Sequence, residues 1–224
     1  MPRIAVVSHN QEVGEGRLTP HLQRHEVLAV WAPAAEFPER VDAAVVLGGF
    51  MGAYQTHQYP WLEDEKQWLR NLAADDVPVL GICLGSQLIA DALGGRAYRA
   101  PLPEVGVVEV HLTAEGRDHP VVAHLGRRVF LAHQDTFEIP EDATLLAASH
   151  EYPIAFQAGT ALGLQSHPEV PADQAATWPD HPEFVMLDQR GLDRAEFLRQ
   201  LEESEADLEA AAEAMFSAWF DGVS

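Results

Sequence analysis

Short apolar runs in the first half of the chain alternate with segments of helical periodicity, and this alternation restricts the fold more than any other feature. Four such runs occupy residues 3–8, 26–32, 42–49 and 77–82. They are rich in Val, Ile, Leu and Ala, which is typical of strands that are buried on both faces. Between the last two runs, residues 60–76 begin with Pro60 and repeat apolar residues at helical spacing. The pattern predicts an α/β fold with one open, mostly parallel sheet and helices on both faces.

The second half of the chain changes to shorter strand-like runs that are separated by turns. These runs occupy residues 106–113, 127–133, 143–150, 153–159 and 161–167. We expect them to form hairpins that add antiparallel strands to the edge of the sheet. After them, residues 194–220 repeat apolar side chains at three- and four-residue steps, which predicts a long helix with an acidic, solvated side.

Composition limits the class of protein. A chain of 224 residues with 47% apolar and 22% charged residues is expected to form one soluble domain spanning residues 1–224. The net charge of -21 repels phosphate backbones and argues against nucleic acid as a partner. No apolar run has the length of a membrane span or of a signal peptide, and the single cysteine excludes an internal disulfide. We therefore expect a cytoplasmic protein with no membrane partner.

That single cysteine, Cys83, lies where a predicted strand becomes a predicted helix. Gly81 and Gly85 flank it at i−2 and i+2, which is the glycine spacing of a nucleophile elbow. The N-terminus of a helix favours a thiolate, and the elbow directs the N–H of Leu84 toward an incoming carbonyl group. The alternative is a buried cysteine that acts as a small apolar side chain.

A thiol nucleophile needs a base and a group that orients the base. His167 and Glu169 are two residues apart at the end of a predicted strand, so both side chains can lie on one face. Gly48 and Gly49 follow another strand and allow a backbone N–H to approach a substrate oxygen. Taken singly, these motifs also fit a surface loop and a tight turn.

Three segments in this order, GGFMG (48–52), GICLGSQ (81–87) and HPE (167–169), resemble the class I (triad) glutamine amidotransferases. The likeness extends from residues 3–8 to about Trp178 and is similar to the amidotransferase domain of guanosine monophosphate synthetase. It implies a flavodoxin-like fold. Residues 179–224 match no motif of the family and form a C-terminal extension.

The resemblance implies a role for each matched residue. Cys83 is the nucleophile, His167 the general base and then acid, and Glu169 the group that orients His167. The N–H of Leu84 and that of either Gly48 or Gly49 form the oxyanion hole. The resemblance implies no metal and no redox cofactor.

The resemblance also implies a set of residues that bind the substrate. Gln87 is expected to bind glutamine, and weaker candidates are His133, Gln134 and Asp135. Glu104 matches an acidic position of the family near the pocket. The sequence departs from the family pattern at Phe50, Ser166 and Gln134, where proline, an aromatic residue and glycine are common. None of these changes removes a catalytic group, but they affect pocket shape.

The implied reaction is hydrolysis of the γ-carboxamide of L-glutamine to glutamate and ammonia through a Cys83 thioester. Residues 1–224 contain no segment resembling a synthetase domain, so the ammonia acceptor is expected on another protein or stays unassigned, and a synthetase is the possible partner. A γ-glutamyl peptidase or hydrolase with the same triad is the alternative. An esterase of the α/β-hydrolase type is disfavoured because the acid directly follows His167. A non-catalytic binding module is disfavoured because all three triad residues are present.

His21 and His25 have the i, i+4 spacing of two metal ligands on a helix. No cysteine and no clear third ligand lies near them in the sequence. We therefore expect surface histidines at these positions and no metal site.

Overall fold

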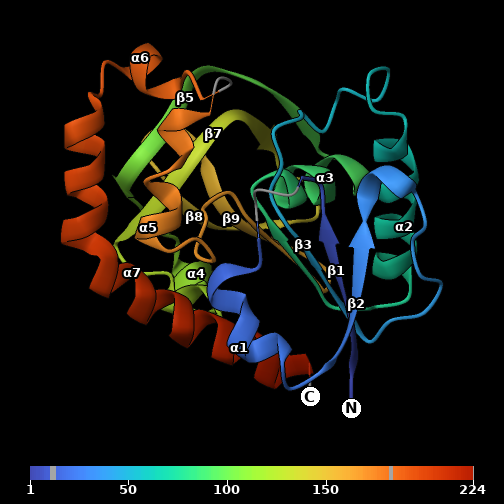
Figure 1. The fold of residues 1–224 in the computed structure, drawn as a ribbon. Coiled ribbons are helices and arrows are strands. Elements are labelled where there is room, and N and C mark those ends of the chain that lie inside the picture. Colours follow the sequence, from blue (N-terminus) through green and yellow to red (C-terminus); the bar gives the residue numbers. More distant parts are fainter. Residues whose placement is uncertain (11–13, 182–183, 224) are drawn as a thin grey trace.

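The computed structural model describes residues 1–10, 14–181 and 184–223, and its centre is an eight-stranded mixed sheet (Figure 1). Its strands are β1 (Arg3–Ser8), β2 (Glu26–Trp31), β3 (Ala43–Val46), β4 (Val79–Ile82), β6 (His111–Leu112), β8 (Thr144–Ala148), β9 (Pro153–Ala158) and β10 (Ala161–Leu164). The order is β2-β1-β3-β4-β10-β9-β8-β6. The pairs from β2 to β10 are parallel, and the pairs from β10 to β6 are antiparallel. The expected mostly parallel sheet with antiparallel strands at one edge is confirmed.

Two of the predicted runs do not join this sheet as expected. Strands β5 (Arg96–Glu109) and β7 (Arg128–Glu138) pair antiparallel in a separate two-stranded sheet. The expectation that every late strand extends the main edge is therefore wrong for residues 127–133. The predicted run 106–113 is also divided, because β5 ends at Glu109 and β6 begins at His111.

Helices cover both faces of the main sheet. The described helices are α1 (Thr19–Leu22), α2 (Trp61–Ala74), α3 (Leu84–Ala92), α4 (Ala114–Asp118), α5 (Ala172–Ala175), α6 (Met186–Arg190) and α7 (Arg194–Val223). Short 3₁₀ turns occupy Gly16–Leu18, Ala32–Ala34, Val122–His124 and Trp178–Asp180. In β1, Ala5 and Val7 pack with residues of α2 and α3. Ile4 and Val6 of the same strand face the other way and pack with residues of α1 and α7.

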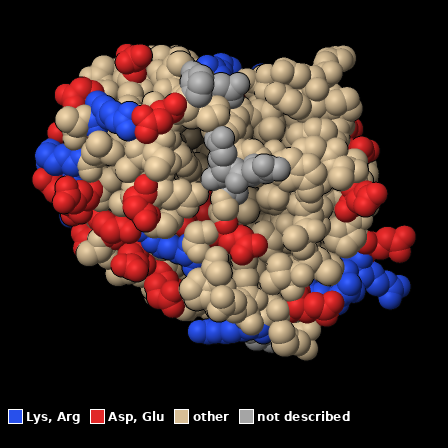
Figure 2. All heavy atoms as spheres, in the orientation of Figure 1, with Lys and Arg blue, Asp and Glu red and all other residues tan. Residues whose placement is uncertain are grey.

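The predicted C-terminal helix is α7, and it lies on the opposite side of the sheet from α2 (Figure 1). Its N-terminal half packs Phe197 and Leu201 against β5 and β7. Its C-terminal half packs Met215 and Phe216 against the main sheet. Acidic side chains gather on the left side of the molecule in Figure 2, where α7 lies, so the expected acidic outer side is confirmed.

The two histidines with metal-ligand spacing both contact α7, with His21 buried and His25 half-buried. His21 is 1% exposed, and its Nε2 lies 3.0 Å from the carboxylate of Glu213. His21 and His25 both stack on Phe220, with ring centroids 5.3 and 5.4 Å apart. The expectation of a surface histidine is wrong for His21, because α7 covers it.

None of the described helices combines the length and hydropathy that a bilayer crossing requires.

Candidate active site

The residues singled out by the sequence come together where the neighbouring strands β1, β3, β4 and β10 end. Gly48 and Gly49 follow β3, and Cys83 follows β4. His167 and Glu169 follow β10, which lies beside β4. Because these four strands are parallel, their carboxyl ends share one edge of the sheet, which is where open α/β sheets form their ligand sites.

Cys83 has the backbone conformation of a strained elbow. Its φ is 50° and its ψ is −107°, which L-amino acids other than glycine rarely adopt. Its N–H donates to the carbonyl oxygen of Leu164 at 2.7 Å, which ties the elbow to the end of β10. The side chain is buried at the first turn of α3.

Both glycines beside Cys83 are required by close packing. A Cβ at Gly85 would lie 2.1 Å from the carbonyl oxygen of Val46. A Cβ at Gly81 would lie 2.4 Å from Ile89 Cδ1 and 2.7 Å from the carbonyl oxygen of Gly85. Real Cβ atoms do not approach so closely, so the turn from β4 into α3 closes only with glycine at both positions.

His167 and Glu169 form a buried pair beside Cys83. Nδ1 of His167 lies 2.8 Å from Oε1 of Glu169, and the two residues are 3% and 0% exposed. Burial lowers the pKa of His167, but the charges of Glu169 and Cys83, and hydrogen bonds to both, outweigh burial and raise it to about 10. The geometry therefore favours the imidazolium form of His167, between the Glu169 carboxylate and the Cys83 sulfur.

The chain around Glu169 is held from two directions. The N–H of Arg17 donates to the carbonyl oxygen of Glu169 at 2.8 Å. The Arg17 guanidinium donates to the carbonyl oxygen of Val170 at 2.5 Å and to the carboxylate of Glu205 in α7 at 2.6 Å. Helix α7 thus contributes to the placement of the acid through Arg17.

Of the paired glycines, Gly48 and Gly49, the first lies directly against His167 and Cys83. A Cβ at Gly48 would be 3.0 Å from Cε1 of His167 and 3.5 Å from Cβ of Cys83. The N–H of Gly49 has no hydrogen-bond acceptor among the described residues, and that of Leu84 is at the first turn of α3, where N–H groups have no partner inside the helix. Two N–H groups are therefore available near the thiol.

The predicted substrate residues line one pocket with the thiol. It is lined by Gly49, Phe50, Met51, Cys83, Gln87, Arg99, Ala132, His133, Gln134, Asp135 and Met186. Gln87 is held by hydrogen bonds from its Nε2 to the carbonyl oxygen of Asp135 at 3.0 Å and to Gln165 at 3.3 Å. Nε2 of Gln134 is buried and has no partner among the described residues.

His133 and Glu104 form a buried pair at the pocket wall. Nε2 of His133 is 3.2 Å from Oε2 of Glu104, and both residues are buried. Nδ1 of His133 is 2.9 Å from the carbonyl oxygen of Asp135. His133, held by Glu104, thus fixes the backbone carbonyl group of Asp135.

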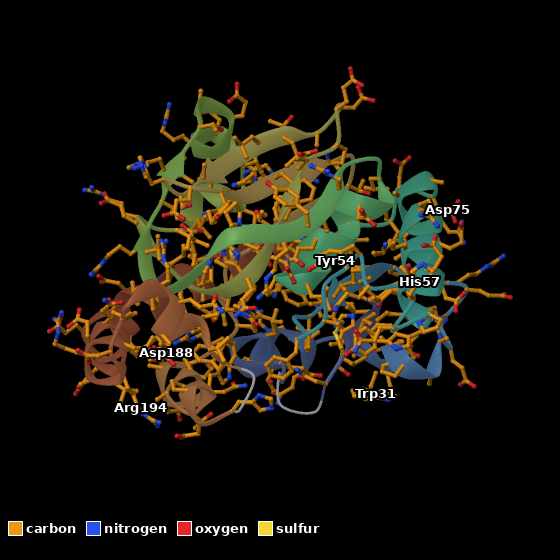
Figure 3. The ribbon with its side chains drawn as sticks, turned by 90° about the horizontal axis from the view of Figure 1, so that it is seen from above. Trp31, Tyr54, His57, Asp75, Asp188 and Arg194 are labelled. Carbon is orange, nitrogen blue, oxygen red and sulfur yellow. The ribbon has the colours of Figure 1, made fainter. Side chains whose placement is uncertain are left out.

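Asp135 lies at the pocket between Tyr54 and Arg99. The Tyr54 hydroxyl donates to Oδ1 of Asp135 at 3.0 Å, and the Arg99 guanidinium lies 3.9 Å from the same atom. Burial raises the pKa of Asp135, and the Tyr54 hydrogen bond and the Arg99 charge oppose this rise. Tyr54 lies toward the middle of the molecule in Figure 3, whereas His57 lies beside α2.

Sequence reasoning missed several residues at this site, including Arg17, Tyr54, Arg99, Trp178 and Met186. Trp178 packs edge-on against His167 with ring centroids 5.1 Å apart, and Met186 of the C-terminal extension lines the pocket. None of them belongs to the three motifs. A useful signal was the placement of Tyr54 just after the paired glycines, on a loop that leaves the carboxyl end of β3.

Among the described residues, no group of three or more histidine, cysteine or acidic side chains is arranged to hold a metal ion. Beside the pocket, the His167 imidazole lies between the Cys83 thiol and the Glu169 carboxylate. A thiol beside a base and a carboxylate that orients the base is the arrangement that nucleophilic acyl transfer requires.

Comparisons with known proteins identify the family. The family model described as glutamine amidotransferase class-I matches residues 20–179. The putative glutamine amidotransferase-like protein YfeJ of Salmonella typhimurium is 30% identical over 175 residues, which cover 75% of this chain and 72% of that protein. A glutamine-hydrolyzing GMP synthase of Thermomicrobium roseum is 44% identical over 98 residues, which cover 42% of this chain and only 18% of that protein.

The fold is shared with solved structures. A glutamine amidotransferase from Thermotoga maritima superposes with a TM-score of 0.85 at 29% identity, covering 98% of both chains. That coverage includes the C-terminal extension as well as the three motifs. The chain belongs to the class I glutamine amidotransferases.

Proposed function

We propose that this chain hydrolyses the γ-carboxamide of L-glutamine to glutamate and ammonia through a thioester on Cys83. The observation that carries the proposal is the placement of Cys83, at a strained elbow beside the buried His167–Glu169 pair. A nucleophile, a base and an orienting carboxylate in this arrangement constitute a triad.

In the first half of the reaction, the Cys83 thiolate attacks the γ-carbonyl carbon and forms a C–S bond. The carbonyl oxygen becomes an oxyanion, which the N–H groups of Leu84 and Gly49 stabilise. The intermediate then collapses, the C–N bond breaks, and the His167 imidazolium gives its proton to the leaving nitrogen. Glu169 keeps the imidazole ring in place throughout this step.

In the second half, His167, now neutral, takes a proton from a water molecule as that water attacks the thioester carbon. The same two N–H groups stabilise the second oxyanion. Collapse breaks the C–S bond, releases glutamate and restores the Cys83 thiolate and the His167 imidazolium. One glutamine and one water thus give one glutamate and one ammonia.

The amino-acid end of glutamine is assigned to the polar side of the pocket. Arg99 offers a positive charge for the α-carboxylate, and Asp135 offers a carboxylate for the α-ammonium group. Gln87 and Gln134 line the same pocket and can hydrogen-bond the substrate.

A second candidate is hydrolysis of γ-glutamyl amides larger than glutamine by the same triad. Phe50 lines the pocket, is 46% exposed and stacks on His181 with ring centroids 4.8 Å apart. Val185 next to the pocket residue Met186 is 42% exposed. An apolar rim of this kind suits a substituent on the γ-nitrogen.

A partner that consumes the ammonia is part of the first proposal. The chain resembles glutamine-hydrolyzing GMP synthases only over a small part of their length. We infer that a synthetase accepts the ammonia, so adding a synthetase and its substrates should raise the rate of glutamate release. An unchanged rate with the synthetase and its substrates present would contradict this partner.

The test is glutamate release from L-glutamine and from a panel of γ-glutamyl peptides by the purified chain. Cys83→Ala should abolish release, because no other residue supplies the nucleophile. Ser204→Ala is a matched control, since it also truncates a small buried side chain but lies in α7 and should keep full activity. Release from peptides alone would favour the second candidate, and equal release by Cys83→Ala would refute both.

A further inference from the structure

A second buried histidine–glutamate pair lies beside the paired glycines and takes no part in the reaction proposed above. His9 follows β1, and Glu65 belongs to α2. Nε2 of His9 lies 3.0 and 3.1 Å from the two carboxylate oxygens of Glu65, and both side chains are 0% exposed. His9 also stacks on Trp61 of α2, with ring centroids 5.8 Å apart. The imidazole ring is therefore fixed on both its edge and its face.

The remaining nitrogen of His9 contacts the backbone of the site. Nδ1 of His9 lies 3.2 Å from the carbonyl oxygen of Gly48. A carbonyl oxygen only accepts hydrogen bonds, so Nδ1 must carry a proton. Its other nitrogen faces a carboxyl group, so a second proton lies between the ring and Glu65. The carbonyl oxygen of Gly48 thus accepts a hydrogen bond from a buried ring that Glu65 holds in place.

The hydrogen bond to Gly48 fixes the orientation of the next N–H. The described peptide bonds are trans, and in a trans peptide the C=O of Gly48 and the N–H of Gly49 point in opposite directions. Gly49 and Cys83 line the substrate pocket, whereas His9 does not. Because the Gly48 carbonyl points to His9, the Gly49 N–H points away from His9 and into the pocket.

A Gly–Gly segment needs such an anchor. Glycine has no Cβ to restrict its backbone, so the peptide between two glycines can rotate more freely than others. A Cβ at Gly48 would lie 3.0 Å from Cε1 of His167, so a side chain at this position would push on the imidazole. A hydrogen bond from outside the pocket restricts the rotation without occupying the space of the substrate.

We propose that His9 and Glu65 are positioning residues, which hold the Gly48–Gly49 peptide so that the Gly49 N–H faces the oxyanion formed at Cys83. The role rests on the proposed function, because it concerns the oxyanion of that acyl transfer. Neither residue touches the substrate. Their effect is confined to reactions at Cys83 that create a negative oxygen.

Two reagents that react with the Cys83 thiol distinguish a loss of oxyanion stabilisation from a general loss of structure or thiol reactivity. Acylation of Cys83 by p-nitrophenyl acetate passes through a tetrahedral oxyanion, forming a C–S bond as p-nitrophenolate leaves. Alkylation of Cys83 by iodoacetamide displaces iodide from carbon and forms no oxyanion. His9→Leu should lower the acylation rate constant by about 10- to 100-fold. Its alkylation rate constant should stay within about threefold of the wild-type value, because that step needs no oxyanion donor.

Two further variants, His9→Asn and His21→Leu, serve as a conservative substitution and as a control. In His9→Asn, the side-chain amide nitrogen takes the place of Nδ1 and can donate to Gly48, so acylation should exceed that of His9→Leu. His21→Leu is the matched control, since His21 is also buried and paired with a glutamate but lies beneath α7. It should acylate at the wild-type rate.

Acylation and alkylation that fall together in His9→Leu, or acylation that does not fall, would overturn the positioning role. If His9→Leu does not fold because Glu65 is left buried without a partner, the double variant His9→Leu/Glu65→Leu removes both polar groups and must show the same selective loss. A wild-type Cys83 that p-nitrophenyl acetate fails to acylate would also overturn the role. A chain that shows the His9-dependent acylation but releases no glutamate from glutamine would refute the proposed function alone.

Discussion

Cys83 occupies a backbone conformation that costs free energy, and its neighbours maintain that conformation. A positive φ at a residue other than glycine costs on the order of 1–3 kcal/mol and persists only where the surroundings impose it. Here the Cys83 N–H is bound to Leu164, and the glycines on either side fit into tight contacts. These contacts offset the cost of the strained backbone. They hold the Cys83 thiol beside His167.

The raised pKa of His167 predicts the alkaline limit of activity. Glu169 is one of the charges that raise this pKa to about 10, so His167 stays protonated through neutral pH and loses its proton as the pH rises through about 10. Since the imidazolium is the acid that protonates the leaving ammonia, glutaminase activity should fall in that range. Glu169→Gln removes a negative charge, lowers the pKa of His167, and should move the alkaline limb to lower pH by about one unit or more.

The measurement is the pH dependence of glutamate release for the wild type, Glu169→Gln and Glu203→Gln. Glu203 is an exposed residue of α7 that pairs with Arg199, so the same substitution there should leave the limb unchanged. An unshifted limb in Glu169→Gln would contradict the assignment of Glu169 as the residue that holds the charged form of His167.

At the scale of elements, the junction between β4 and α3 depends on Gly85. Gly85→Ala would place a Cβ 2.1 Å from the backbone oxygen of Val46, so β3 and α3 must separate. We expect a loss of about 1–3 kcal/mol in the free energy of unfolding. Gly222→Ala is the matched control, because nothing lies within 4 Å of that Cβ. It should be neutral or stabilising by up to about 1 kcal/mol.

Urea unfolding of the three proteins measures both differences. A Gly85→Ala variant as stable as the wild type, and equally active, would show that the elbow tolerates a side chain at this position. The account of the glycine spacing would then be wrong.

Elements with a simple local hydrophobic pattern could be predicted from the sequence. Residues 3–8 and 77–82 are continuous apolar runs, which is typical of strands buried on both faces, and the 3.6-residue repeat of residues 194–220 predicts α7. The first half of β5 was missed because Arg96–Glu104 contains two prolines and three charged residues and does not alternate. Its pairing with β7, in a sheet apart from the main one, is decided by tertiary packing and leaves no local signal.

Some residues of the candidate site could also be predicted from local sequence, and others could not. Cys83, His167 and Glu169 lie in short motifs with fixed spacing, and their motifs could be read directly. His9 and Glu65 are 56 positions apart and meet only because β1 lies beside β3 and α2 packs on that face. Contacts of this range depend on the completed topology, so no window of sequence reports them.

At the scale of the whole molecule, α7 joins the two sheets. Its first half packs on β5 and β7 and its second half on the main sheet, and Glu205 between them binds Arg17 near the acid of the site. The C-terminal extension is therefore part of the folded unit that supports the pocket. This explains why a segment with no family motif contributes Met186 to the site.

Truncation of the side chain that anchors α7 should destabilise the whole fold. Phe216 is 0% exposed in the main core, so Phe216→Ala should lower the free energy of unfolding by about 3–5 kcal/mol. Phe50→Ala makes the same chemical change at a residue that is 46% exposed and should cost about 1 kcal/mol or less. Equal costs in denaturant unfolding would contradict the role of α7 in closing the core.

Labelling of Cys83 by a diazoketone analogue of glutamine, followed by intact-mass and peptide analysis, shows whether this thiol attacks a bound glutamine. We expect one label per chain, on Cys83, with a rate that L-glutamine lowers by competition and that His167→Asn lowers strongly. No label from the analogue, on a thiol that iodoacetamide still alkylates, would show that the pocket does not present glutamine to Cys83. That result would contradict the proposed function.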